Sequence, residues 1–218
     1  ILHPKKINYV DQFNEKESNL VKNYNLDIII RHDFSIIRGD ILNASKYGIW
    51  SFHHGDNSVN RGSPPGFWEI FLKEKYVGVT LQRLTSELDG GLIIDKAYFN
   101  RHWSLVKTQD DIFESGVSLL MKNLNMVISD NLKFEKSAIY NNPLYRIPSL
   151  VNLFKYSISF YTSLANKFFT PILQQLSIVR YDCWTLFIGK GDFLNSQLFR
   201  LKPLKLPKNE FWADPFLY

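Results

Sequence analysis

The sequence predicts an α/β fold built around an open, partly parallel sheet, and three observations carry this expectation. Residues 27–31 and 48–52 are short apolar runs of the kind that a parallel sheet buries on both faces. Residues 38–47 between them are long enough for a turn or short helix, so the pair forms a strand, crossover, strand unit. Residues 109–129 repeat apolar side chains at alternating steps of four and three, which predicts a long helix.

The segment after the second strand continues the same pattern. A polar loop at 54–63 leads to Pro64 and Pro65, which predict the start of a short helix with an apolar face. Residues 76–84 and 91–98 follow as two more strands, joined by a turn. These elements extend the predicted sheet.

The helix at 109–129 is the longest periodic segment of the chain. Thr108, with Asp111 three residues later, is a plausible N-cap. We expect one stripe of this helix to face the core, made by Phe113, Val117, Leu120, Leu124 and Val127.

The C-terminal third of the sequence differs in its pattern of apolar residues from the rest, which predicts a separate structural organisation. We expect a catalytic domain at 1–134, a helical linker at 135–180 whose aromatic side chains pack in a core, and a β segment at 181–218. The chain opens on Ile1 and stops inside an apolar run that ends at Tyr218, so we expect a fragment truncated at both ends.

Composition argues against several classes of function. Residues 1–147 hold 18 basic and 17 acidic side chains, so we expect no nucleic-acid partner for this part. The single cysteine, Cys183, leaves no internal disulfide; it fits a buried small residue and a cytoplasmic location. The most apolar stretch, 147–176, is broken by two lysines, and we expect no membrane span.

The segment from Ser51 to Asn57 holds the candidate chemistry. It lies at the carboxyl end of a predicted parallel strand, where open α/β sheets bind their ligands. His53 shares a face with Ser51, whereas His54 faces the other way and packs or caps within the loop. The two histidines with Asp56 leave a metal site open as an alternative, although neighbouring strand residues point to opposite faces.

Asp89 lies in a glycine-flanked turn between the last two predicted strands. An acid followed by two glycines is common turn chemistry. By itself, this pattern does not separate a turn residue from a functional carboxylate.

Taken together, the motifs between Gly48 and Ile94 resemble those of the formyltransferase family that includes methionyl-tRNA formyltransferase and the sugar N-formyltransferases. That family has an Asn-x-His pair at a strand end, a loop leading to Arg-Gly and a proline, a Gly-Val-Thr strand and a Leu-Asp-Thr-Gly turn. The resemblance covers residues 20–130, and the matching motifs are Ser51-Phe52-His53, Arg61-Gly62 with Pro65, Gly78-Val79-Thr80 and Leu88-Asp89-Gly90-Gly91.

The resemblance implies a Rossmann-like formyltransferase sheet that lacks its N-terminal strands, and transfer of a formyl group from 10-formyltetrahydrofolate to an amine. It implies that His53 lies beside the reacting carbon, donating to the formyl oxygen or accepting the amine proton, with Asp89 as its carboxylate partner. Ser51 stands where the family has an asparagine that helps to hold the formyl oxygen, and it is the weakened third catalytic member.

The resemblance also implies a binding loop for substrate and cofactor. Arg61 either binds an anionic substrate or pairs structurally. Gly90 stands where the family has a threonine. The residues implied in binding are His54, Gly55, Asp56, Asn57, Arg61, Gly62, Leu88 and Gly90.

A second resemblance concerns residues 209–216, Asn-Glu-Phe-Trp-Ala-Asp-Pro-Phe. They are similar to the opening of a five-bladed β-propeller found in glycosidase-like domains and beside glucosamine inositolphosphorylceramide transferases. This implies that Asp214 is a site residue of that further domain, although a turn before Pro215 explains it equally. A sugar-handling module favours an amino sugar over aminoacyl-tRNA as the acceptor.

Competing hypotheses remain beside a sugar formyltransferase. Because Ser51 replaces the asparagine, the domain could bind a folate or nucleotide sugar without turnover. A second alternative is an enzyme like methionyl-tRNA formyltransferase. A third is a metal-dependent hydrolase, which would use His53, His54 and Asp56. The sequence leaves the oligomeric state unknown.

Overall fold

A computed structural model describes residues 2–32, 35–87, 91–129, 131–136, 140–176, 186–189 and 201–204. The chain divides into two compact units, Ile1–Arg101 with Leu105–Arg146, and His102–Ser104 with Ile147–Tyr218. The domain boundaries expected from the sequence remain a prediction.

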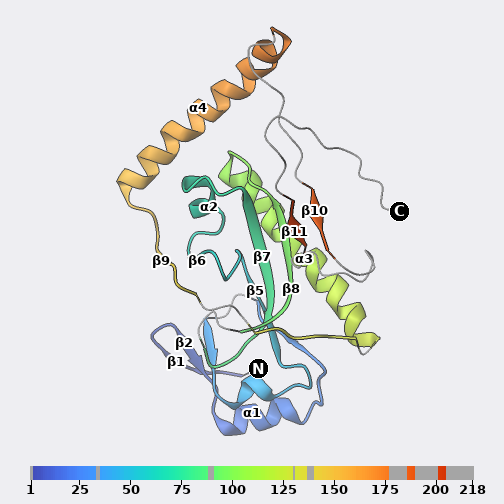
Figure 1. Cartoon of the computed structure of the whole chain (residues 1–218). Helices are drawn as coiled ribbons and strands as arrows, with labels where there is room; N and C mark the ends of the chain where they lie inside the picture. Colours follow the sequence, from blue (N-terminus) through green and yellow to red (C-terminus); the bar gives the residue numbers. More distant parts are fainter. Residues whose placement is uncertain are drawn as a thin grey trace, which may run out of the picture. The chain divides into compact units, whose positions relative to one another are not determined.

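A four-stranded open sheet forms the centre of the first unit (Figure 1). β3 and β5 are parallel, which confirms the predicted strand, crossover, strand unit. β7 runs antiparallel to both of its neighbours. In spatial order the strands are β3 (Ile29–Ile30), β5 (Ile49–His53), β7 (Tyr76–Arg83) and β8 (Leu92–Asn100).

The long helix α3 (Leu105–Ile128) covers one face of this sheet and packs on β7 and β8 (Figure 1). The predicted helix is confirmed, but its start is not. Because α3 begins at Leu105, Thr108 lies inside the helix and is fully buried instead of capping it. A Cβ at Gly66 would lie 2.9 Å from the Thr108 methyl carbon, so Gly66 lets the helix approach closely.

The buried stripe of α3 differs from the predicted stripe. Phe113 and Val117 are 51% and 62% exposed, whereas the residues one position earlier in the chain face the sheet. Small and polar side chains such as Gly116 occupy part of this stripe, which hydrophobicity alone does not reveal. The predicted Leu120, Leu124 and Val127 are partly buried and pack against the apolar cluster. The buried residues are Thr108, Ile112, Gly116, Leu119 and Asn123.

Two apolar clusters lie on opposite faces of β5. Trp50 belongs to the cluster under α3, and Ile49 belongs to the other, as strand alternation requires. The first cluster contains Trp50, Val77, Val79, Leu81, Ile94, Ile112 and Leu119. The second contains Phe13, Ile37, Ile41, Leu42, Ala44 and Ile49.

The N-terminal region forms a small sheet and a helix, α1, that the sequence analysis did not anticipate, whereas the turn or short helix expected within 38–47 is present as a 3₁₀ helix. β2 pairs antiparallel with β1 and parallel with β4. The helix α1 begins with a capping box between Asn14 and Glu17. These elements are β1 (Lys5–Ile7), β2 (Val10–Gln12), α1 (Glu15–Lys22), β4 (Ile36–Arg38) and the 3₁₀ helix η1 (Asp40–Asn43).

Two short elements complete the first unit beside the sheet. The helix α2 (Phe67–Phe71) follows the predicted proline pair and buries Phe67. β6 (Arg61–Gly62) pairs parallel with β9 (Leu144–Tyr145). Gly62 is required there, because its φ is +125° and a Cβ would lie on the Tyr145 carbonyl oxygen.

The second unit holds the helix α4 (Leu150–Gln175) and an antiparallel pair, β10 (Phe187–Ile188) with β11 (Lys202–Pro203). Among the described residues, most aromatic side chains of α4 are exposed, Phe154 and Phe168 among them, so the expected core packing is not seen. No described helix is long and apolar enough to cross a membrane.

Candidate active site

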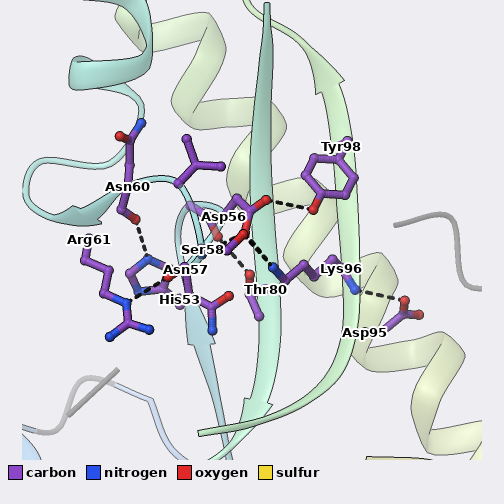
Figure 2. A network of polar contacts seen from close by, with 12 residues as sticks. His53, Asp56, Asn57, Ser58, Asn60, Arg61, Thr80, Asp95, Lys96 and Tyr98 are labelled. Carbon is purple, nitrogen blue, oxygen red and sulfur yellow. Dashed lines mark hydrogen bonds and ion pairs between the residues drawn. The ribbon is translucent and has the colours of Figure 1, made fainter. Parts of the chain in front are cut away.

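His53 is the last residue of β5, and the loop after the strand holds its imidazole ring. Its Nε2 atom lies 3.0 Å from the carbonyl oxygen of Asn60 (Figure 2). Because a carbonyl only accepts hydrogen bonds, Nε2 carries the hydrogen, and the lone pair of the neutral ring is on Nδ1. The loop therefore fixes both the position and the tautomer of this histidine.

A buried carboxylate, Asp56, anchors the same loop to β8. Its Oδ1 accepts hydrogen bonds from the Lys96 ammonium group and, at 2.6 Å, from the Ser58 hydroxyl. Its Oδ2 accepts from the Tyr98 hydroxyl at 2.7 Å (Figure 2). Lys96 and Tyr98 lie two positions apart on β8, so they share one face of the sheet.

The pKa values of this network follow from burial and pairing. Burial opposes the charge of Asp56, but the Lys96 ammonium and the hydrogen bonds from Ser58 hold the pKa of that carboxyl below its ordinary value. Burial and the neighbouring carboxylate raise the pKa of Tyr98. Asp56 is therefore a charged anchor for the loop.

The Gly-Val-Thr segment of β7 is shaped to receive this loop. A Cβ at Gly78 would lie 2.9 Å from the Asp56 Cβ, so only glycine leaves room for the carboxylate. Thr80 donates its hydroxyl hydrogen to the Gly55 carbonyl at 3.0 Å. Val79, between them, points to the opposite face and joins the core. Each residue of the motif thus has a physical role.

A second carboxylate, Glu69 of α2, lies close to the His53 ring. A Cβ placed on Gly55 would be 3.4 Å from His53 Nε2 and 3.5 Å from Glu69 Oε1, so both atoms surround one point. Burial is the largest influence on the Glu69 carboxyl and raises its pKa, against the opposing effect of His53. Glu69 is thus an ionisable neighbour of the candidate base.

Ser51 lies on the same face of β5 as His53 and is only 2% exposed. Its hydroxyl oxygen accepts a hydrogen bond of 2.8 Å from Nη1 of Arg31, at the end of β3. Ser51, which stands where the resembled family has an asparagine, is therefore hydrogen-bonded to the Arg31 guanidinium.

His54 faces away from this site, as the alternation along β5 predicts. Its ring lies between Phe52 and Phe113, with centroids at 6.2 and 5.0 Å. Burial, followed by the charges of His53 and Arg31, lowers the pKa of His54. The His54 side chain therefore packs against aromatic rings.

The metal alternative finds no support in this geometry. His53, His54 and Asp56 engage the Asn60 carbonyl, aromatic rings and Lys96, respectively. Within the described ranges, no group of three or more His, Cys, Asp or Glu side chains is placed to hold a metal ion. The three residues do not converge on one point.

Arg61 and Asn57 brace the end of the loop. Arg61 Nε donates to the Asn57 carbonyl at 2.8 Å, and the guanidinium carbon lies 4.5 Å from the centroid of the Tyr140 ring. The Tyr140 hydroxyl accepts from the Arg61 backbone N–H at 3.0 Å. These contacts are structural, and anion binding by Arg61 stays a prediction.

Four of the predicted site residues, Leu88, Asp89, Gly90 and Asp214, lie outside the described residues, as does Cys183. The pairing of His53 with Asp89 therefore stays a prediction. The structure adds Lys96, Tyr98, Glu69 and Arg31 to the site, none of which the sequence analysis named.

The chain is similar in sequence to methionyl-tRNA formyltransferases, although no protein-family model matches it. It is 32% identical to the enzyme of Rickettsia bellii over 114 residues, 51% of this chain and 38% of that protein. It is 29% identical to the enzyme of Clostridium tetani over 140 residues, 62% of this chain and 44% of that protein. The chain thus spans less than half the length of these curated relatives.

Solved formyltransferase structures share the fold of the chain. The N-formyltransferase from Helicobacter canadensis, in complex with folinic acid and dTDP-3-aminofucose, matches with a TM-score of 0.52, 18% identity, and 65% and 58% of the two chains covered. The formyltransferase PseJ from Anoxybacillus kamchatkensis, in complex with UDP-4,6-dideoxy-4-formamido-L-AltNAc and tetrahydrofolate, matches with a TM-score of 0.50, 22% identity, and 63% and 71% covered. The Rossmann-like formyltransferase fold expected from the sequence is confirmed.

Proposed function

We propose that this chain carries the catalytic domain of a folate-dependent formyltransferase, with an amino sugar or sugar nucleotide as acceptor. The observation that carries the proposal is the single-tautomer imidazole of His53 at the carboxyl end of β5, on a fold shared with formyltransferases. The sequence similarity to methionyl-tRNA formyltransferases supports the same reaction class.

The reaction requires one proton to move from the acceptor to the donor. The amine nitrogen of the acceptor attacks the formyl carbon of 10-formyltetrahydrofolate and forms a tetrahedral species with an anionic oxygen and a cationic nitrogen. The new C–N bond stays, the bond to N10 of the folate breaks, and N10 takes up the proton. Catalysis therefore needs a base for the amine and a donor for the oxygen.

His53 fits the role of the base. Its Nε2–H donates to the Asn60 carbonyl, so Nδ1 is the atom of the neutral ring that can accept the amine proton. The role of donor to the formyl oxygen through Nε2 would require this hydrogen bond to break. Of the two roles that the resemblance left open, the geometry favours the acceptor of the amine proton.

Asp89 is proposed as the carboxylate that stabilises the His53 imidazolium. β7 ends at Arg83, which is paired with Trp50, and eight residues connect it to β8. Trp50 precedes His53 by three residues, about 10 Å along a strand. Gly91 lies against the Arg83 carbonyl, and Asp89 is two residues earlier, a reach of about 7 Å from that point. The pairing of Asp89 with the ring therefore rests on the motif resemblance, and Asp89→Asn tests it.

The remaining predicted residues take supporting roles in the proposal. Asp56, paired with Lys96, holds the loop in place, and Asn57 and Arg61 shape its far end. The proposed layout keeps residues 1–134 as the catalytic domain, followed by a helical linker and the start of a β-propeller that would carry Asp214.

Methionyl-tRNA is the second candidate acceptor, because the curated relatives are methionyl-tRNA formyltransferases. Two observations favour the amino sugar. The structures that share the fold include enzymes bound to amino-sugar nucleotides. In addition, residues 1–147 hold 18 basic and 17 acidic side chains, which gives little attraction for the phosphates of a tRNA.

The proposal is tested by incubating the purified protein with 10-formyltetrahydrofolate and a panel of dTDP- and UDP-amino sugars and methionyl-tRNA. We expect formyl transfer to at least one amino sugar. His53→Ala and Asp89→Asn should each lower kcat by about 10²- to 10⁴-fold, the usual contribution of a general base and its support.

The matched control is His54→Phe, because His54 packs between aromatic rings on the other face. It should keep a rate within about threefold of the wild type, as expected for a side chain outside the reacting groups. Wild-type rates in both His53→Ala and Asp89→Asn would overturn the assignment. Transfer to methionyl-tRNA alone would replace the proposed acceptor.

A further inference from the structure

One face of the helix α4 carries a continuous apolar stripe that is exposed to solvent. Steps of three and four connect its positions, and the last of them lies one residue past the end of the helix. Every side chain of the stripe is exposed, with Leu150 at 84% and Phe168 at 69%. The α4 stripe consists of Leu150, Phe154, Ile158, Tyr161, Ala165, Phe168, Ile172 and Leu176.

The opposite face of α4 is polar. A helix turns by about 100° per residue, which places two lysines, Lys155 and Lys167, on either side of the polar row. Both lysines therefore lie between the polar row and the α4 stripe, where a long side chain keeps its charge in water while the apolar face is buried. The polar row consists of Asn152, Ser159, Ser163, Asn166 and Thr170.

The printed aromatic contacts between α4 and Trp103, which belongs to the same unit, lie away from the α4 stripe. Trp103 packs on Phe160 with ring centroids 5.0 Å apart, and the Lys167 ammonium lies 5.7 Å from the centroid of the indole ring. Phe160 and Lys167 are about 120° or more around the helix axis from the centre of the stripe. Trp103 therefore covers one side of the helix and leaves the exposed stripe open.

The sequence around α4 is basic, unlike the sequence before it. Residues 136–181 hold five basic side chains and no acidic one, whereas residues 1–135 hold 16 basic and 17 acidic side chains. A second copy of α4 on the stripe would bring lysines together without a carboxylate to pair them. Anionic phospholipid headgroups, in contrast, complement this charge.

The dimensions of α4 suit a helix that lies on a bilayer. It has 26 residues, so its length is about 39 Å. Its polar row and two lysines oppose complete burial in lipid, and no described helix is long and apolar enough to cross a membrane. An apolar face rich in phenylalanine, together with lysines beside a polar face, is typical of helices that bind in the plane of the membrane interface.

We propose that α4 binds the surface of a bilayer that contains anionic phospholipids. The α4 stripe enters the boundary between headgroups and acyl chains, and Lys155 and Lys167 face the phosphates. The chain then lies on the membrane through α4 without spanning it. This proposal does not depend on the proposed function.

The test is flotation of the full chain with vesicles in a density gradient. One set of vesicles is phosphatidylcholine alone, and the other is an equal mixture of phosphatidylcholine and phosphatidylserine. We expect the chain to float with the mixed vesicles and to bind phosphatidylcholine at least about tenfold more weakly, because two or more lysines each contribute about fivefold. Added sodium chloride should weaken binding to the mixed vesicles.

Two pairs of substitutions separate the apolar and the charged contribution. Phe154→Ser with Phe168→Ser should weaken binding to the mixed vesicles by at least about tenfold, because two phenyl rings no longer enter the bilayer. Lys155→Gln with Lys167→Gln should weaken it by about fivefold for each lysine and leave binding to phosphatidylcholine unchanged. The lysine pair leaves the α4 stripe intact, so it tests the proposal even if the serine pair lowers the unfolding midpoint.

The matched control is Val106→Ser with Val117→Ser, which removes exposed apolar side chains from α3 and should bind the mixed vesicles like the wild type. Several results would overturn the proposal: no flotation of the wild type, equal binding to both kinds of vesicle, or wild-type binding by the phenylalanine pair. A dimer in light scattering that Phe154→Ser with Phe168→Ser dissociates, without flotation of the wild type, would assign the stripe to a second copy and also overturn it.

Discussion

The two faces of β5 differ sharply although their residues alternate along five positions. One face carries Ser51 and His53, which are hydrogen-bonded to Arg31 and the Asn60 carbonyl. The other carries Trp50 and Phe52, which join an apolar cluster under α3. The comparison teaches that Ser51 and His53 are retained beside the apolar core because each has a hydrogen-bond partner on its own face.

Contacts between the loop after β5 and the strand β8 hold the polar face in place. The buried pair Asp56 and Lys96, together with the partly exposed Tyr98, ties the loop after β5 to β8. On the other face, Gly116 brings α3 close to Phe52, and the buried Asp95 of β8 binds Asn123 and Lys122 of α3. The polar face should therefore be sensitive to loss of charge, and the apolar face to gain of polarity.

The largest stability effect is expected for Lys96→Met. It leaves the Asp56 carboxylate buried without its ammonium partner, which costs about 3–5 kcal/mol. Urea unfolding followed by far-UV circular dichroism measures the change. The double variant Lys96→Met with Asp56→Asn should lose less than the single variant; equal losses would show that the charge pair is not what anchors the loop.

A smaller effect is expected from exchanging threonine and valine on opposite faces of β7. Thr80→Val removes the donor to the Gly55 carbonyl, and Val79→Thr places a hydroxyl in the apolar cluster. Each should cost about 1–3 kcal/mol in the same unfolding experiment, because each leaves a buried polar group without a partner. If Thr80→Val were neutral and Val79→Thr costly, the polar face would need no hydrogen bonds, and the comparison would fail.

The smallest effect is a change of stability with pH due to His54. Its pKa is lowered in the folded protein, so the folded state disfavours its charge. As pH falls below the ordinary value of 6.5, the unfolded chain takes up this proton first, and stability is lost. His54→Phe should make stability less dependent on pH between about 5 and 7. An unchanged slope would show that His54 does not contribute.

Elements with a long apolar run or a long period could be predicted from the sequence. The strands near 48–52 and 76–84 were found close to their expected positions, because buried residues leave an apolar run in the sequence. Of residues 27–31 only Ile29–Ile30 form a strand, and Ile30 is 46% exposed. The small sheet of β1, β2 and β4 was missed, since strands of three residues show no period. The capping box of Asn14 and Glu17 was a readable signal that was not used.

The site was predicted in part, and the limit was long-range pairing. The shared face of Ser51 and His53 and the opposite orientation of His54 follow from strand alternation. The partners of Asp56 are 40 and 42 positions away on β8, and Arg31 is 20 positions from Ser51, so local patterns could not reveal them. The predicted apolar stripe of α3 was right at its C-terminal end, where Leu120, Leu124 and Val127 pack against the core. It was wrong at Phe113 and Val117, because the helix turns Thr108, Ile112 and Gly116 toward the sheet there.

The most direct test of the account compares the two neighbouring histidines in one assay. Formyl transfer from 10-formyltetrahydrofolate to an amino sugar is measured for His53→Asn and His54→Phe under saturating substrate. The account predicts a loss in kcat of about 10²- to 10⁴-fold for His53→Asn and a change of less than about threefold for His54→Phe. Equal losses in both, or a larger loss for His54→Phe, would contradict it.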